Sequence, residues 1–293
     1  ANLWVASVPK DNTTPMGVYQ FDGKDWRVHD VTSGLPSNAA GDVAADARGQ
    51  VWVGTWGKGL AVRDTSGAWH TLNQNNSPLH GCCGGNSYVV VTDIQRDSQG
   101  IMWVGNIHTG LIAMDGYPPT RTMVYGQAAL GLGAQRDMGE FAIAPDGLKW
   151  IATPLDGFVL FDDGGTPFAA GDDHSQVFST LTEARLPSDR ASAALVDAAG
   201  RVWIGTDNGL VQITGSYTRA THTFRIDSWR VFGTSTGLPS SAVPALAEDA
   251  QGNVWVGTDA GLAQIGAASG AVTFALTTSN SGLIDDRVNA LLY

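Results

Sequence analysis

The sequence is poor in cysteine and in basic residues, and it has no long apolar run. Its only cysteines, Cys82 and Cys83, are adjacent, so they cannot link distant parts of a fold. The 17 Lys and Arg against 28 Asp and Glu give a formal net charge of −11, which argues against binding nucleic acid or an anionic membrane. No apolar run reaches the roughly 18 residues of a spanning helix, so we expect no membrane insertion within this chain.

Glycine and tryptophan are abundant, with 37 and 10 residues, and both occur in a repeated phrase. A short apolar segment centred on a Trp recurs six times, about every 50 residues. The copies are Trp4 (LWVAS), Trp52 (VWVGT), Trp103 (MWVGN), Trp150 (KWIAT), Trp203 (VWIGT) and Trp255 (VWVGT). Each is followed by a Gly and an apolar residue that open a further short strand. The chain therefore consists of internal repeats.

Each copy predicts four short strands. An Asp-x-x-Gly segment precedes four of the copies, beginning at Asp46, Asp97, Asp197 and Asp249, and it is typical of a tight turn with Gly at positive φ. Apolar segments lie before and after these turns, and no helical periodicity is present. A four-stranded unit of about 40 to 50 residues repeated in this way is typical of a β-propeller. We predict an all-β fold, a six-bladed β-propeller with four antiparallel strands per blade, as one domain over residues 1–293.

Both ends of the sequence fall within one repeat. Aligned on the segment that begins at Gly237, the last residues from Gly282 end in an innermost strand, and Ala1 lies just before a second strand. We expect one blade to be shared by N- and C-terminal strands, which would protect the sheet edges. The missing initiator Met, and a break inside so tight a turn, lead us to expect a processed chain or a piece of a longer one.

The repeated phrase itself is structural. Its Trp and the apolar neighbours pack between adjacent blades, where an indole buries a large area. The following Gly is expected where backbones of adjacent blades crowd, although two copies carry Ala instead, at Ala6 and Ala152. A functional site is therefore expected where the repeat is broken.

The segment GLPSSAVPALAEDAQGNVWVGTDAGL, residues 237–262, closely resembles the two-component regulator propeller repeat. The resemblance extends over essentially the whole chain; it is most specific around Trp52, Trp203 and Trp255 and weaker at Trp4 and Trp150. It implies an extracytoplasmic bacterial propeller, periplasmic or extracellular, that senses a ligand, often a glycan, and passes a signal to a downstream kinase. Related repeats also occur in secretion-system accessory proteins, which implies docking of another protein as the alternative.

The segment HGCCGGN, residues 80–86, replaces the GLPS found in other copies. Adjacent cysteines there could form a vicinal disulfide, a flat apolar platform suited to stacking a sugar face or an aromatic ring. Alternatively, two thiolates and His80 could hold a soft metal, or the segment is a surface loop with incidental thiols. Because propeller ligands usually sit where such loops gather, we take as candidate ligand-binding residues His80, Cys82, Cys83, Asn86, Trp56 and His108.

Acidic residues mark the inner strands of three consecutive repeats. Four residues before the turn position lie Asp42, Asp93 and Glu140, whereas the other three repeats have Ala there. Equivalent positions face a central channel, so these carboxylates could hold a cation such as Ca²⁺, or they bond backbone amides and channel water. No other cofactor is expected.

Mixed charges are predicted at the strand mouths, where they could bind sugar hydroxyls or pair with each other. These further candidates are Arg136, Asp137, Asp189, Arg190, Asp286 and Arg287. No catalytic residues are predicted, because the six His share no repeat position and neither a sialidase-like Arg triad nor a nucleophile elbow is present. A glycosidase would need paired carboxylates, which Asp42, Asp93 and Glu140 could supply, so a lyase or hydrolase is the least favoured class.

Overall fold

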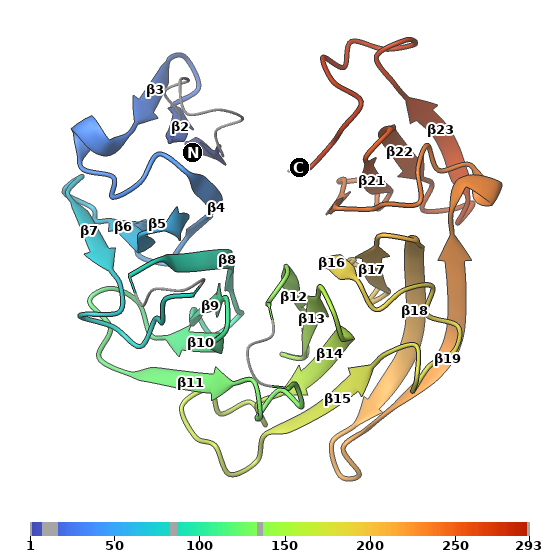
Figure 1. Ribbon diagram of the computed structural model, residues 1–293, viewed down its shortest axis with the longest axis horizontal. Coiled ribbons are helices and arrows are strands. Elements are labelled where there is room, and N and C mark those ends of the chain that lie inside the picture. The colour runs from blue at the N-terminus through green and yellow to red at the C-terminus, as the bar shows by residue number, and fades with distance from the viewer. Residues whose placement is uncertain (1, 8–16, 83–86, 134–136, 292–293) are drawn as a thin grey trace. The chain divides into compact units, whose positions relative to one another are not determined.

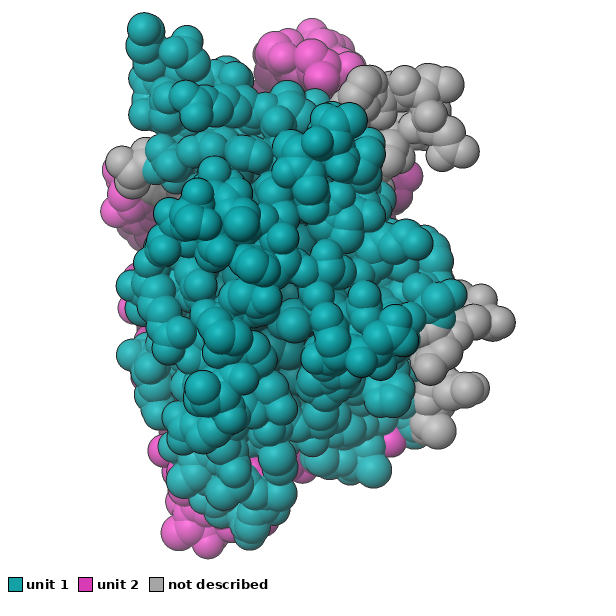
Figure 2. Space-filling view, turned by 90° about the vertical axis from the view of Figure 1, so that its left-hand side faces the viewer, with its two compact units in different colours: residues 1–129, 133–138, 165–172 teal, residues 130–132, 139–164, 173–293 magenta. Residues whose placement is uncertain are grey.

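The computed structural model describes residues 2–7, 17–82, 87–133 and 137–291. In these residues 23 β-strands form five antiparallel sheets, with two short 3-10 helices, η1 (Val31–Ser33) and η2 (Thr234–Thr236), between strands (Figure 1). The chain divides into two compact units, coloured separately in Figure 2. Unit 1 comprises residues 1–129, 133–138 and 165–172, and unit 2 comprises residues 130–132, 139–164 and 173–293. The single domain over residues 1–293 stays a prediction.

Unit 1 contains a three-stranded and an eight-stranded sheet. The first consists of β1 (Leu3–Ala6), β2 (Val18–Phe21) and β3 (Trp26–His29). The second consists of β4 (Ala40–Ala45), β5 (Val51–Gly57), β6 (Gly59–Arg63), β7 (Trp69–Leu72), β8 (Val89–Arg96), β9 (Met102–Asn106), β10 (Gly110–Met114) and β11 (Thr122–Gly126). It contains two four-strand groups, β4 to β7 and β8 to β11, which join through a short pairing of β5 with β8.

Unit 2 contains three four-stranded sheets. They are β12 (Phe141–Ile143), β13 (Lys149–Thr153), β14 (Gly157–Asp162) and β15 (His174–Phe178); β16 (Ala191–Val196), β17 (Val202–Thr206), β18 (Gly209–Thr218) and β19 (Thr223–Phe232); and β20 (Ala245–Glu248), β21 (Val254–Thr258), β22 (Gly261–Ile265) and β23 (Val272–Leu276). In each sheet the strands pair in sequence order, as the repeat predicts.

Five of the repeated Trp residues lie on the second strand of a four-strand group, which confirms the strand assignment, and Trp4 lies on β1 of the three-stranded sheet. Trp52, Trp103, Trp150 and Trp203 are at most 1% exposed, whereas Trp4 and Trp255, in the first and last repeats, are half-buried. The Gly after the Trp is sterically required, as expected. A Cβ on Gly205 would overlap the carbonyl oxygen of Val243 in the following repeat.

The turns that join first and second strands have the predicted form. Gly49, Gly100, Gly200 and Gly252 all take φ between 76° and 85°. We call the end of the strands that carries these turns the turn end, and the opposite end, where the chain enters the inner strands, the loop end. The Asp that begins each turn bonds its amides, and it also accepts a hydrogen bond from the indole N–H of the repeated Trp. The sequence pattern predicted the role of this Asp in the turn but not its hydrogen bond with the indole.

Closure of a six-bladed ring stays a prediction. In the described part of the chain, β1 has no first strand beside it in its sheet, and residues 277–291 form no strand. No helix among the described residues is long and apolar enough to cross a bilayer.

Candidate ligand site at the loop end

Two exposed aromatic rings lie at the loop end of unit 1. Trp56 is 45% exposed although it lies within β5, and Tyr88 is 46% exposed and directly precedes β8. Trp56 is the last residue but one of β5, and its backbone N–H donates to Ala39 O at 2.9 Å. Tyr88 packs across Gly57, since a Cβ there would lie 2.6 Å from Tyr88 Cε2. The absence of a side chain at Gly57 therefore lets the ring of Tyr88 lie close to the backbone beside Trp56.

The loop before β8 is held by hydrogen bonds on both sides. The Cys82 N–H donates to Tyr88 O at 2.8 Å, and the His80 N–H donates to the side-chain oxygen of Asn106 at 2.9 Å. Asn106 is fully buried and its amide donates to Val90 O at 2.7 Å. These contacts fix the base of the loop while the His80 residue stays exposed.

Cys82 is 4% exposed and disulfide-bonded. Its sulfur is therefore not a free thiolate that could bind a soft metal. Cys83 and Asn86 lie outside the described residues, so the platform formed by the two cysteines stays a prediction.

The side chains of His108 and Asp137 lie within hydrogen-bonding distance of each other. His108 Nε2 lies 3.1 Å from Asp137 Oδ1, and the backbone of His108 takes φ of 64°, which is uncommon for a residue other than Gly. This backbone conformation turns the imidazole toward the segment that carries Asp137. Arg136, the neighbouring candidate, lies outside the described residues.

The arginines predicted at the strand mouths of unit 2 form two equivalent ion pairs. Arg190 Nε lies 3.2 Å from Asp207 Oδ2, and Arg287 Nε lies 3.3 Å from Asp259 Oδ1. In each pair the Asp belongs to the turn between the second and third strands. All four side chains are about half exposed or more, so each pair contributes little to stability and can exchange partners.

The aspartates beside them bind backbone. Asp189 accepts hydrogen bonds from the Thr180 N–H at 2.6 Å and the Thr180 hydroxyl at 2.7 Å. Asp286 accepts from the Thr278 N–H at 2.6 Å. Both carboxylates tie the loop after an outer strand to the segment that enters the next repeat, so their described contacts are structural.

The three inner acids divide between the units. Asp42 and Asp93 lie side by side in unit 1, where the Ile94 N–H donates to both carboxylates, while Glu140 precedes β12 in unit 2. Among the described residues, no three His, Cys, Asp or Glu side chains form a group that could hold a metal ion. The calcium ion stays a prediction; Asp42 and Asp93 both accept from the Ile94 N–H, and Asp93 also accepts from the Gln95 side chain at 3.2 Å.

Trp56 was among the ligand-binding residues predicted from the sequence, whereas Tyr88 was not. The available signal was an aromatic residue two positions after the inserted segment of residues 80–86, immediately before an aliphatic strand. Two outer-strand histidines have side-chain hydrogen-bond partners. His70 Nε2 lies 2.7 Å from Asp64 Oδ2, and His29 Nε2 lies 3.0 Å from Gln20 Oε1. Burial, followed by the nearby Arg63, lowers the pKa of His29.

The strand pattern and the repeat define an all-β protein of the propeller type. Four segments match the family model described as two component regulator propeller, at residues 34–57, 84–108, 185–208 and 237–260. The chain therefore carries the two-component regulator propeller repeat, and the resemblance found in the sequence is confirmed. No functionally curated protein matches this sequence.

Solved structures share the fold. The extracellular domain of a candidate hybrid two-component system from B. thetaiotaomicron is 20% identical with a TM-score of 0.73, covering 98% of this chain and 34% of its own. PorZ, a surface component of the type-IX secretion system of Porphyromonas gingivalis, is 22% identical with a TM-score of 0.73, covering 99% and 42%. Virginiamycin B lyase from Staphylococcus aureus is 11% identical with a TM-score of 0.61, covering 94% and 88%. This chain thus spans less than half the length of the first two.

Proposed function

We propose that this chain is a non-catalytic ligand-binding propeller that works outside the cytoplasm and recognises a glycan or another small molecule at the loop end of unit 1. The repeat, and the likeness to extracellular domains of two-component systems and to a surface secretion component, support this class and location. A sensing role within a two-component system is part of the proposal.

The exposed aromatic pair carries the proposal. Trp56 and Tyr88 each expose nearly half of a large ring on a folded strand end, where the neighbouring Gly57 has no side chain to cover them. A flat ring with an apolar face and a polar edge suits the alternating C–H and hydroxyl surfaces of a sugar. The hydroxyl of Tyr88 and the indole N–H of Trp56 would provide hydrogen bonds at the ring edges, and His80 would add a third polar group.

Binding is favoured over catalysis by the contacts of the charged candidates. Asp189 and Asp286 accept from backbone amides, Asp137 lies beside His108, and Asp207 pairs with Arg190. A hydrolase needs one carboxyl group free to protonate a leaving group and a second placed opposite it. The likeness to the lyase, at 11% identity, concerns the fold alone.

An array of immobilised neutral and acidic glycans tests the proposal, with any hit measured by titration calorimetry. Trp56→Ala and Tyr88→Ala should each weaken binding at least about 10-fold, since stacked aromatic side chains dominate such contacts. Trp26→Ala is the matched control, because Trp26 is 55% exposed on the outer strand β3.

Equal losses in the control, or unchanged binding in both site variants, would contradict a site at Trp56 and Tyr88. Failure of every glycan to bind would contradict glycan recognition and favour the protein-docking alternative.

A further inference from the structure

Four repeats share a hydrogen bond between the repeated Trp and the Asp that begins the turn. The indole N–H of the Trp donates to Asp Oδ2 at 2.8 to 3.3 Å. The four pairs are Trp52 with Asp46, Trp103 with Asp97, Trp203 with Asp197, and Trp255 with Asp249. A carboxylate is thus the regular acceptor for this indole.

The repeat of Trp150 lacks that acceptor. Ala144 occupies the Asp position, while the turn keeps the same backbone bonds, with Ala144 N–H donating to Leu148 O at 2.8 Å and Gly147 N–H to Ala144 O at 2.9 Å. Trp150 is 1% exposed, and among the described residues its indole N–H has no hydrogen-bond partner. Unlike the indole nitrogen of Trp229, the Trp150 nitrogen is not a fully buried atom without a partner, so it is accessible from the groove that Trp150 lines.

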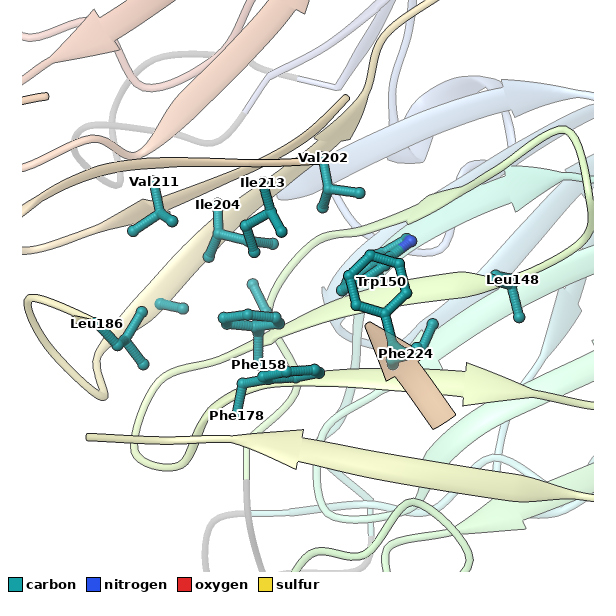
Figure 3. Close-up of a cluster of buried hydrophobic side chains, with 13 residues drawn as sticks. Leu148, Trp150, Phe158, Phe178, Leu186, Val202, Ile204, Val211, Ile213 and Phe224 are labelled. Atoms are coloured by element: carbon teal, nitrogen blue, oxygen red, sulfur yellow. The ribbon is translucent and has the colours of Figure 1, made fainter. Parts of the chain in front are cut away.

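A groove of about 390 Å³ opens at this position on the turn end of unit 2. Its lining includes Ala144, Leu148, Trp150, Val202, Tyr217 and Phe224. Figure 3 shows Trp150 against Phe224, with the nitrogen-bearing edge of the indole directed away from Phe158 and Phe178. The groove is within the size range of small-molecule sites, and it combines apolar walls with one fixed donor.

A longer hairpin builds the far wall. β18 and β19 are ten residues each, about twice the length of β22 and β23, and they bulge at Gly215, where a Cβ would overlap the ring of Phe224. Phe224 then meets Trp150 edge-on, with ring centroids 4.9 Å apart and planes at 82°. The extension is fixed by Arg219, whose Nε lies 3.2 Å from Asp162 Oδ2 and whose Nη2 donates to Asp146 O at 3.0 Å.

The charges around the groove disfavour an anionic occupant. Asp146 contributes a carboxylate to the lining, whereas the positive charge of Arg219 is matched by Asp162, which is 2% exposed. Burial and the charge of Asp162 raise the pKa of Tyr217 to about 12, so its hydroxyl stays protonated. An anion would face Asp146 without a free cation in the described lining.

We infer that this groove binds a small uncharged molecule with a flat or cyclic apolar body and a carbonyl or hydroxyl oxygen that accepts a hydrogen bond from the Trp150 indole N–H. The oxygen takes the place that the Asp carboxylate has in the four other repeats. The ring lies between Trp150, Phe224 and Tyr217. This site is at the turn end and does not depend on the function proposed for the loop end.

Benzamide is a suitable probe, because it has a flat ring and a neutral carbonyl, and benzoate is its anionic counterpart. In protein with ¹⁵N-labelled indoles, the Trp150 resonance is identified by its loss in Trp150→Phe. Benzamide should shift that resonance downfield with a dissociation constant on the order of 1 mM, as expected for so small a ligand. Benzoate should bind at least about 10-fold more weakly. Absence of a benzamide-dependent shift of the Trp150 resonance would overturn the inference.

Ala144→Asp tests the role of the indole N–H most directly, because it introduces the Asp that four other repeats have at the same turn position. The variant should fold, and its Trp150 indole resonance should be shifted in the absence of ligand. Its affinity for benzamide should be at least about 10-fold lower than that of the parent protein. Ala169→Asp adds the same charge at an exposed position and should leave benzamide binding unchanged. Asp146→Asn should leave the affinity for benzamide unchanged and should reduce the difference in affinity between benzamide and benzoate. Benzamide affinity equal in Ala144→Asp and in the parent protein would rule out the indole as its donor.

Discussion

Asp42 and Asp93 share one backbone donor. The Ile94 N–H lies 2.6 Å from Asp42 Oδ2 and 2.8 Å from Asp93 Oδ1, so the two carboxyl groups meet at a single amide. Burial raises the pKa of Asp42, and hydrogen bonds from Val43, Ile94 and Asp93 oppose that effect. Two carboxyl groups this close favour a state with one shared proton.

This pair predicts a loss of stability with rising pH. The folded pKa of Asp42 lies above its ordinary value of 3.8, so the unfolded chain releases the proton first. The free energy of unfolding should therefore decrease as pH rises above about 4, until the folded pKa is passed. Asp42→Asn removes the titration but keeps an acceptor for Ile94 and a donor for Asp93. Urea unfolding should show equal stabilities near pH 3 and a more stable variant at pH 7. A pH-independent difference would refute the shared proton.

The substitution Ala144→Asp should also stabilise the fold. It gives the Trp150 indole a charged acceptor and adds side-chain bonds to turn amides, worth about 1 kcal/mol together. The converse change, Asp197→Ala, removes the bonds to the Trp203 indole, to the Arg201 side chain and to turn amides, and should cost about 2 to 3 kcal/mol. Thermal unfolding followed by circular dichroism measures both, and shifts in the same direction would contradict this account of the turn.

Gly205→Ala should destabilise the protein by at least about 2 kcal/mol, because the added methyl group would overlap Val243 O and push β17 away from the segment that leads into β20. Gly171→Ala is the matched control: no atom lies within 4 Å of the added Cβ and its φ is not positive. It should change the unfolding midpoint little. Equal effects at both positions would show that chain entropy, rather than crowding, sets the need for glycine.

Lys149 forms a buried ion pair that distinguishes its repeat from the others. Its Nζ lies 2.8 Å from Asp163 Oδ1, and both side chains are 2% exposed. Lys149→Met introduces the residue found before Trp103 but leaves a buried carboxylate without this partner, and it should cost about 3 to 5 kcal/mol. Adding Asp163→Asn should recover part of that loss in a double-mutant cycle. Additive losses would indicate that the pair contributes no coupling energy.

The repeat predicted the strands because its signals are local. A Trp between aliphatic residues and a Gly at positive φ act within a few residues, so β17 and its turn at Gly200 follow from short sequence patterns. The exposure of Tyr88 depends instead on the bare backbone of Gly57, some thirty residues away in sequence. The groove beside Trp150 depends on a single Ala and on a hairpin from the next repeat, and no local pattern links them.

The pairing of β5 with β8 affects how the second and third repeats unfold locally. Repeat proteins are held by nearest-neighbour interfaces, and each repeat can in principle open by itself. Trp56 and Gly57 pair with Val90 and Val89, so a ladder of main-chain bonds continues from one repeat into the next. Opening either of these repeats must break that ladder. The second and third repeats should therefore exchange their amide hydrogens as one cooperative block, and a force applied to one would be carried to the other through backbone rather than through side chains.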